Sequence, residues 1–257
     1  MKKQFGQNFL VDKKIISKII ESSEIKENSI VYEVGSGNGA LTQEIIKKKP
    51  IKFISIEIDT ILKKKLEIFF QKKNHKLIFA DALNFDESNY FKNNVIIISN
   101  LPYNISLKLL IKWIFQYSKK RWIHSMVLMF QKEVADRILS ESNSKKFGRI
   151  TLLVSAFFKV SKIIDVDKKN FYPVPKVNST VLKFTPLENP LFNFTNLNKL
   201  ELLSKIFFAN KRKKLKKKIE EIFDKNIIEH EKLNKFYNLR AENLDKNTYF
   251  YLAKLLK

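Results

Sequence analysis

The chain has 257 residues, and its content of 44% hydrophobic and 12% aromatic residues excludes a disordered polymer. Its 49 Lys and Arg residues outnumber its 26 Asp and Glu residues, and the formal charge of +23 favours a polyanionic partner, nucleic acid ahead of an anionic membrane surface. The chain has no Cys, which excludes disulfides, thiolate metal sites and a Cys nucleophile.

The first part of the chain alternates predicted strands and helices. An amphipathic helix is predicted over residues 11–22, where isoleucines recur at helical spacing and Asp12 can cap the first turn. Short apolar runs that stop at turn residues predict strands over residues 29–34, 52–56, 76–80, 95–99, 125–130 and 180–184, with helices over 41–48, 61–70, 105–117 and 131–139. This alternation predicts an α/β fold with a doubly wound, mostly parallel sheet.

The last part of the chain shows a different pattern. From Leu197 onward the apolar periodicity is only helical, and helices are predicted over residues 197–209, 211–223, 227–237 and 246–256. We therefore expect two domains, an α/β domain over residues 1–188 and a small all-helical domain over residues 189–257. Residues at the amino terminus form no apolar signal core and no stretch reaches membrane-spanning length, so we expect a cytoplasmic protein without a membrane partner.

Three of the five glycines lie in one turn after the first predicted strand. A chain so poor in Gly that places Gly35, Gly37 and Gly39 together needs them for backbone geometry, as when the main chain approaches a ligand closely. Glu57, at the end of the second strand, lies near the distance expected for a carboxylate that binds ribose hydroxyls. Two kinds of cofactor fit these residues: a nicotinamide or flavin dinucleotide, and S-adenosylmethionine.

Two further strand ends distinguish these cofactors. Asp81 follows the third strand, where a carboxylate can accept a hydrogen bond from an adenine amino group, which favours the methyl donor. A dehydrogenase would also need an acid–base group, and none of the three histidines directly follows one of these strand ends. The fourth strand ends at residues 100–103, Asn-Leu-Pro-Tyr, because Pro102 cannot donate to a sheet and disfavours a helical residue before it.

Residues 100–103 are suited to the amino group of a planar base. Hydrogen bonds from an adenine amine to the Asn100 amide oxygen and the Leu101 carbonyl would localise the nitrogen lone pair, and Tyr103 would stack on the base. A sulfonium methyl group held in line then needs no metal ion and no covalent enzyme intermediate. We predict Asn100, Leu101 and Tyr103 as catalytic residues, with S-adenosylmethionine as the methyl donor.

Two other segments complete the predicted site. Phe171 precedes Pro173 and Pro175, which hold its segment extended, and it is the candidate for a second stacking face around an unstacked base. A basic run opens one helix of the predicted small domain and is expected to contact RNA phosphates; its first residues are Lys211, Arg212, Lys213 and Lys214.

Together these segments resemble the ribosomal RNA adenine-N6,N6 dimethyltransferase family, and the resemblance runs nearly from end to end. The matching motifs are residues 7–10, 33–39, 100–106 and 173–179. The resemblance implies a Rossmann-like class I methyltransferase sheet followed by a small helical domain that binds RNA and the ribosome. It also implies that the donor site, in which we include Gly37 of the glycine turn, is lined by Asn8, Leu10, Gly35, Glu57, Asp81 and Asn100.

Several features look like the small-subunit branch of this family, namely Leu101 and residues 131–135, 147–149, 211–213 and 240–244. Asn178 departs from it, because that branch often has Asp there. The resemblance implies a monomeric enzyme that dimethylates two adjacent adenosines in a hairpin near the 3′ end of small-subunit (16S) rRNA in the 30S particle. The alternatives are a large-subunit (23S) methylase of the macrolide-resistance type and a non-catalytic ribosome assembly factor. The intact Glu57, Asp81 and Asn100 argue against the assembly factor.

Overall fold

The structure is a computed structural model that describes residues 8–190, 192 and 194–256, so Gln7 of the first motif lies outside the described residues. The chain divides into two compact units, residues 1–135 with 159–186 and residues 136–158 with 187–257. The last of the three crossings between the units, after residue 186, lies close to the predicted boundary after residue 188. Residues 136–158, which we assigned to the first domain, belong to the second unit.

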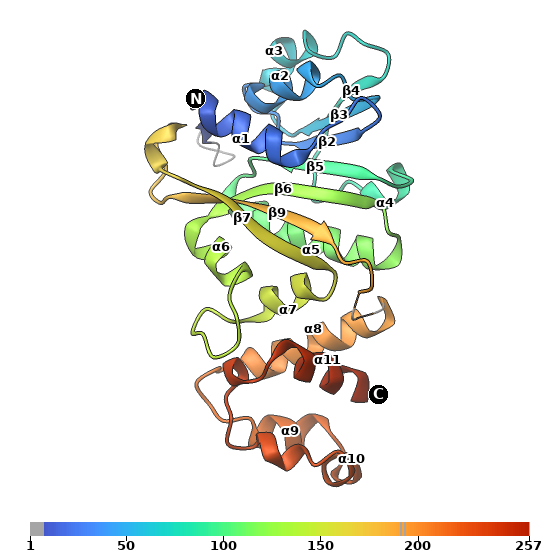
Figure 1. The fold of residues 1–257 in the computed structure, drawn as a ribbon, viewed down its shortest axis with the longest axis vertical. Helices are drawn as coiled ribbons and strands as arrows, with labels where there is room; N and C mark the ends of the chain where they lie inside the picture. The colour runs from blue at the N-terminus through green and yellow to red at the C-terminus, as the bar shows by residue number, and fades with distance from the viewer. Residues whose placement is uncertain (1–7, 191, 193, 257) are drawn as a thin grey trace. The chain divides into compact units, whose positions relative to one another are not determined.

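The first unit is built on a seven-stranded sheet (Figure 1). From one edge to the other, its strands are β4 (His75–Phe79), β3 (Lys52–Glu57), β2 (Ile30–Val34), β5 (Val95–Ser99), β6 (Ile123–Gln131), β9 (Ser179–Pro186) and β7 (Phe158–Val166). The strands from β4 to β6 are parallel, and β9 pairs with β6 in the antiparallel direction. The chain passes from β2 outward to β3 and β4 and returns to β5 on the other side of β2. This reversal of strand order is where open α/β sheets bind their ligands.

Helices cover both faces of this sheet. The helices of the unit are α1 (Lys13–Ser23), α2 (Ala40–Lys47), α3 (Lys63–Glu67), α4 (Glu87–Tyr90), α5 (Tyr103–Lys119) and α6 (Lys132–Ile138), with a short 3-10 turn η2 (Thr60–Leu62) before α3. Val31 packs in a core cluster with buried isoleucines of α1, whereas its neighbour Tyr32 points to the face that carries α5. Asp12 caps α1 as predicted, accepting hydrogen bonds from the main-chain N–H groups of Lys14 and Ile15 at 2.8 and 3.0 Å.

Several segments of this unit differ from the prediction, and β7 and α4 were not predicted at all. The helix expected over residues 61–70 is reduced to η2 and α3, because Leu66 is the one buried anchor of α3 and short helices depend on packing for stability. The irregular lead-in instead contains β1 (Phe9–Leu10), which pairs antiparallel with β8 (Phe171–Tyr172). Local periodicity cannot reveal this pair, because each strand has only two residues and the partners lie far apart in the chain.

The second unit is helical, apart from the beginning of β7. Its helices are α7 (Arg149–Ser155), α8 (Phe194–Phe208), α9 (Lys216–Ile222), α10 (Lys225–His230) and α11 (Lys246–Leu255), with 3-10 turns η4 (Leu233–Phe236) and η5 (Ala241–Asn243). Helix α8 packs against α7 and α11 through buried Leu203, Phe207 and Tyr249. Among the helices described in either unit, none is long and apolar enough to cross a membrane.

The predicted helix over residues 211–223 begins later than expected. Asn210 has a left-handed backbone (φ +52°) after α8, and the basic run of Lys211 to Lys214 lies in the turn that follows, so that α9 begins only at Lys216. Lys214 also forms an isolated β-bridge with Arg240, which holds this turn out of the helix.

Candidate active site

The carboxyl ends of β2, β3, β4 and β5 open into one cavity of the first unit, with a volume of about 900 Å³ including its mouth. The cavity lies where the strand order reverses, the position at which open α/β sheets bind nucleotide-like ligands. Of the residues predicted for the site, those in the lining are Asn8, Leu10, Gly35, Gly37, Glu57, Asp81, Asn100, Leu101 and Tyr103. The structure therefore brings together residues that are spread over almost one hundred positions of the sequence.

The glycine turn, residues 35–39, exposes main chain to this cavity. Gly35, Gly37 and Gly39 all have positive φ angles, of 75°, 54° and 86°. A Cβ atom at Gly35 would meet nothing within 4 Å, so its absence leaves the main chain accessible from open space. At Gly37 a Cβ atom would stand 2.9 Å from the Phe9 ring. Gly35 thus permits the close approach of a ligand to the backbone, the geometry expected for a nucleotide-like cofactor, whereas Gly37 leaves room for the Phe9 ring.

Glu57, at the end of β3, is 3% exposed and is held by main-chain donors. Its Oε2 atom accepts a hydrogen bond from the Gly37 N–H at 2.9 Å, and its Oε1 atom accepts from the N–H groups of Ile58 and Asp59, both at 2.9 Å. The carboxylate therefore has one fixed orientation at the cavity wall and links the glycine turn to β3. An acceptor held in this way suits the paired hydroxyls of a ribose.

Asp81 lies in the loop of residues 80–86, which we call the donor loop. Its Oδ1 atom accepts from the Leu83 N–H at 2.9 Å and its Oδ2 atom from the Asn84 side chain at 3.2 Å. Carboxylate oxygens have further acceptor capacity beyond one bond each. Asp81 and its neighbour Ala82 both line the cavity.

Glu33, in β2, also lines the cavity, although we assigned it no role from the sequence. It is 1% exposed, and its Oε2 atom accepts hydrogen bonds from the hydroxyls of Thr42 at 2.6 Å and Ser55 at 3.3 Å. Burial raises the pKa of the Glu33 carboxyl to about 7, an effect that these two hydrogen bonds oppose and the charge of Glu57 reinforces. Only the fold reveals this environment, because a Glu before a glycine turn is not by itself a sign of burial.

Residues 100–103 follow β5 and form what we call the acceptor motif. The Asn100 Nδ2 atom donates to the Asn8 carbonyl at 3.1 Å, and this assignment leaves the Oδ1 atom as an acceptor toward the cavity. The Ser99 hydroxyl donates to the Val34 carbonyl, which ties the end of β5 to the end of β2. Leu101, whose carbonyl is the second predicted acceptor, is 2% exposed and also lines the cavity.

Tyr103 begins α5 and is half-buried beside the cavity. Its hydroxyl lies 2.6 Å from the Ser179 hydroxyl at the start of β9, and burial raises the pKa of the phenol. The sequence placed Ser179 in a motif but could not show that it meets Tyr103. The Oδ1 atom of Asn178 accepts from the Lys168 N–H at 3.0 Å, so the departure from Asp at this position retains a side-chain acceptor.

Phe171 is placed differently from the other predicted residues. It pairs with Leu10 across β1 and β8, is 2% exposed and belongs to the core cluster of the first unit. It is not among the described residues that line the cavity, whereas its neighbour Tyr172 is 66% exposed. The structure thus places Phe171 in the core, outside the described lining of the cavity. Its role as a stacking face stays a prediction.

The predicted RNA contacts lie in the second unit, in the turn before α9. The Lys211 Nζ atom donates to the Lys145 carbonyl at 2.6 Å and the Lys214 Nζ atom to the Asn238 side chain at 3.0 Å, whereas Arg212 and Lys213 are exposed. Part of this run therefore stabilises the turn itself.

Comparison with curated proteins shows full-length relatives. A protein of Pelagibacter ubique named ribosomal RNA small subunit methyltransferase A is 42% identical over 253 residues, which cover 98% of this chain and 95% of that protein. A protein of the same name from Borreliella burgdorferi is 41% identical over 257 residues, with coverage of 99% and 88%.

Solved structures show the same fold. A dimethyladenosine transferase from Plasmodium falciparum superimposes with a TM-score of 0.80 at 28% identity, covering 96% of this chain and 99% of that one. The 23S rRNA methyltransferase ErmE superimposes with a TM-score of 0.72 at 22% identity, covering 97% and 99%. The family model described as ribosomal RNA adenine dimethylase matches residues 1–257. The chain therefore belongs to the ribosomal RNA adenine dimethylase family and is an S-adenosylmethionine-dependent methyltransferase with a Rossmann-like class I sheet.

Proposed function

We propose that this enzyme transfers methyl groups to N6 of two adjacent adenosines in a hairpin near the 3′ end of small-subunit (16S) rRNA, during maturation of the 30S particle. The observation that carries this proposal is the Asn100 amide in the lining of the cavity, whose Nδ2 atom donates to the Asn8 carbonyl and so leaves its oxygen to act as an acceptor. The choice of the small subunit is supported by relatives of 41–42% identity that carry this name over nearly their full length.

The donor occupies the part of the cavity next to the glycine turn. S-adenosylmethionine supplies a methyl group on a cationic sulfur. The accessible main chain at Gly35 admits the donor close to the backbone, Glu57 accepts from its ribose hydroxyls, and Asp81 accepts from its adenine amino group. Asn8 and Leu10 close the site from the amino-terminal segment.

The acceptor motif holds the base to be modified. The Asn100 Oδ1 atom and the Leu101 carbonyl accept the two N6 hydrogens of the target adenine, while Tyr103 stacks on its ring. As the new N–C bond forms, the S–C bond of the donor would break, its electron pair would stay on the sulfur as a neutral thioether, and one N6 proton would pass to water. At the second transfer only one N6 hydrogen remains, so only one of the two acceptors is then used.

Labelled donor incubated separately with small-subunit particles, large-subunit particles and free rRNA tests this proposal. The expected result is label on two adjacent adenosines of the small-subunit rRNA, lost in Asn100→Ala. Label confined to large-subunit RNA would show the resistance-type activity instead. No transfer by a folded enzyme to any of the three would indicate an assembly factor without catalysis.

The basic run and the helical unit are proposed to bind the RNA, and the enzyme is proposed to act as a monomer on the 30S particle. Replacing Lys211, Arg212, Lys213 and Lys214 by Gln should make the dependence of log affinity on log salt shallower, by roughly one for each phosphate that the run neutralises. Replacing the exposed Lys63, Lys64 and Lys65 of α3 by Gln is the matched control, expected to leave the slope unchanged. If the slope of the basic-run variant equals that of the control and of the wild type, the basic run only stabilises its turn and does not contact RNA phosphates.

A further inference from the structure

We propose that Lys112 is a positioning residue of the methyl-donor site, which holds the donor loop in the shape that presents Asp81, with Glu87 as its buried counter-ion. The inference rests on the proposed assignment of Asp81 to the adenine of the donor. It concerns two residues that lie outside the described lining of the cavity and outside the sequence motifs.

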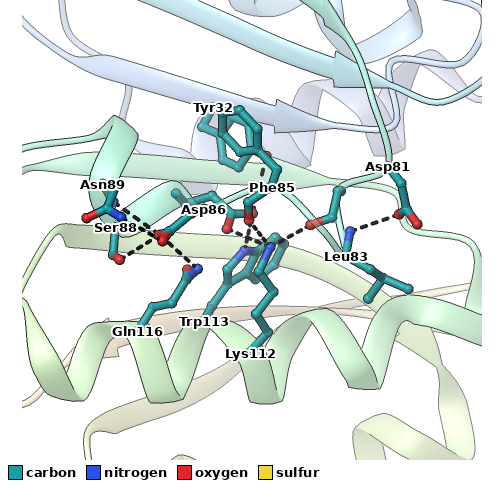
Figure 2. Close-up of polar contacts among 12 residues, drawn as sticks. Tyr32, Asp81, Leu83, Phe85, Asp86, Ser88, Asn89, Lys112, Trp113 and Gln116 are labelled. Atoms are coloured by element: carbon teal, nitrogen blue, oxygen red, sulfur yellow. Dashed lines mark hydrogen bonds and ion pairs between the residues drawn. The ribbon is translucent and has the colours of Figure 1, made fainter.

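The contact begins on α5, nine residues or about two and a half turns beyond Tyr103. The Lys112 Nζ atom donates to the Ala82 carbonyl at 2.6 Å and also to the Phe85 carbonyl. Both carbonyls belong to the donor loop. Figure 2 shows Lys112 and Trp113 side by side on this helix, pointing toward the loop that carries Asp81 and Leu83.

Glu87 balances the charge of this lysine. The Glu87 side chain is fully buried, and its Oε2 atom lies 2.7 Å from the Lys112 Nζ atom. Its Oε1 atom accepts from the Trp113 indole N–H at 2.9 Å and from the Tyr32 hydroxyl at 3.3 Å. Burial and then the charge of Glu87 raise the pKa of Tyr32 far above its ordinary value. A fully buried carboxylate is tolerated because two hydrogen bonds and one close ion pair offset the cost of its burial.

The number of partners explains why this position needs an ammonium group. An ammonium has three N–H donors and no acceptor. Two main-chain carbonyls accept hydrogen bonds from the Lys112 Nζ atom, and the Glu87 Oε2 atom lies 2.7 Å away as an ion-pair partner without hydrogen-bond geometry, so an uncharged or shorter side chain could not replace all three contacts. Charge-assisted bonds of this kind are the strong ones, and here they join a loop to a helix.

The consequence for the donor site follows from the shape of the loop. Ala82 directly follows Asp81 and lines the cavity with it, and the Asp81 carboxylate is oriented by the N–H of Leu83 one residue further on. Because Lys112 holds the carbonyls of Ala82 and Phe85, the turn between these two residues has little conformational freedom. The direction of the Asp81 carboxylate therefore depends on Lys112. Because α5 begins at Tyr103, one helix carries part of the acceptor motif and supports the donor loop.

Isothermal calorimetry with two ligands tests this role without any RNA. The ligands are S-adenosylhomocysteine and its inosine counterpart, which has a 6-oxo group in place of the adenine amino group. The wild-type enzyme should prefer the adenine compound, because Asp81 only accepts. The variant is Lys112→Met/Glu87→Gln, which removes both charges and so leaves no buried ion unpaired. It should lose the preference by on the order of tenfold while its melting temperature stays close to that of the wild type.

Two further variants complete the design. Lys108→Met removes an exposed lysine one turn earlier on α5 and should keep the full preference. Asp81→Asn should abolish the preference, because its amide can donate to a 6-oxo group. An unchanged preference in the folded Lys112→Met/Glu87→Gln variant, with the preference lost in Asp81→Asn, would overturn the role of Lys112 alone. A preference retained in Asp81→Asn would overturn the donor-site assignment and this inference with it, whatever the RNA substrate proves to be.

Discussion

The donor and acceptor sides of the cavity are held in different ways. On the donor side, the Glu57 and Asp81 carboxylates accept mainly from main-chain N–H groups of their own turns and of the glycine turn. On the acceptor side, Asn100 is oriented by the carbonyl of Asn8, 92 residues away, and Tyr103 by Ser179, 76 residues away. The donor-side carboxylates thus accept from main-chain groups no more than 20 residues away, with Lys112 as a longer-range support of the donor loop, whereas the acceptor side is oriented by contacts across 76 and 92 residues. Substitutions should separate the two sides.

The largest effect is expected for Asn100→Ala. Losing the acceptor that localises the N6 lone pair should lower kcat by about 10³-fold, or ~4 kcal/mol in the barrier. Affinity for S-adenosylhomocysteine, measured by calorimetry, should change less than in Glu57→Ala, which removes a donor-side carboxylate. Equal activity of Asn100→Ala and wild type would contradict the mechanism.

Phe171→Ala tests how far the acceptor side depends on long-range packing. Removing a fully packed ring from the core should lower the free energy of unfolding by at least about 3 kcal/mol, measured by urea denaturation. Tyr172→Ala, at an exposed neighbour in the same strand, should cost far less. A stable Phe171→Ala enzyme that loses kcat would instead show that the ring stacks on the base.

Glu33→Gln tests the buried carboxyl on the donor side. Because its folded pKa is about 7, above the ordinary value of 4.5, the folded state keeps a proton that the unfolded state has lost. This contribution to stability is full below pH 4.5 and is lost as the pH rises through 7. From pH 5 to pH 8 the wild type should therefore lose roughly 2 to 3 kcal/mol more than Glu33→Gln. Parallel pH profiles of the two proteins would show that Glu33 is ionised in the folded protein.

The smallest effect is expected for Ser179→Ala. It removes the hydrogen bond that fixes the Tyr103 ring but leaves the ring itself, so kcat/KM for RNA should fall by about 1 kcal/mol, or several-fold. Affinity for S-adenosylhomocysteine should not change, since Ser179 is outside the described lining of the cavity. A loss of donor affinity as large as the loss of activity would remove the distinction between the two sides.

Local patterns were enough to predict most of the first unit. Its parallel strands, the glycine turn and the residues at the strand ends all follow from apolar runs that stop at turn residues. Parallel strands bring their carboxyl ends to one edge, so Glu57, Asp81 and Asn100 had to meet there once the strand order was a doubly wound one. The site was therefore largely predictable, because these three residues each lie at the end of a recognisable strand, whereas Asn8 and Leu10 were expected only from the family resemblance.

Local sequence patterns thus predict the chemistry of the residues at the strand ends. The long-range contacts that hold those residues in place depend on the tertiary structure. The pairing of β1 with β8, the burial of Phe171 and the buried Lys112–Glu87 pair join segments that no local period relates. The predicted helix over residues 61–70 shortened for the same reason, since its stability depended on packing that its own pattern could not show. The role of Lys112 can be recognised only in the folded protein, because the fold brings two carbonyls and a carboxylate to its amino group.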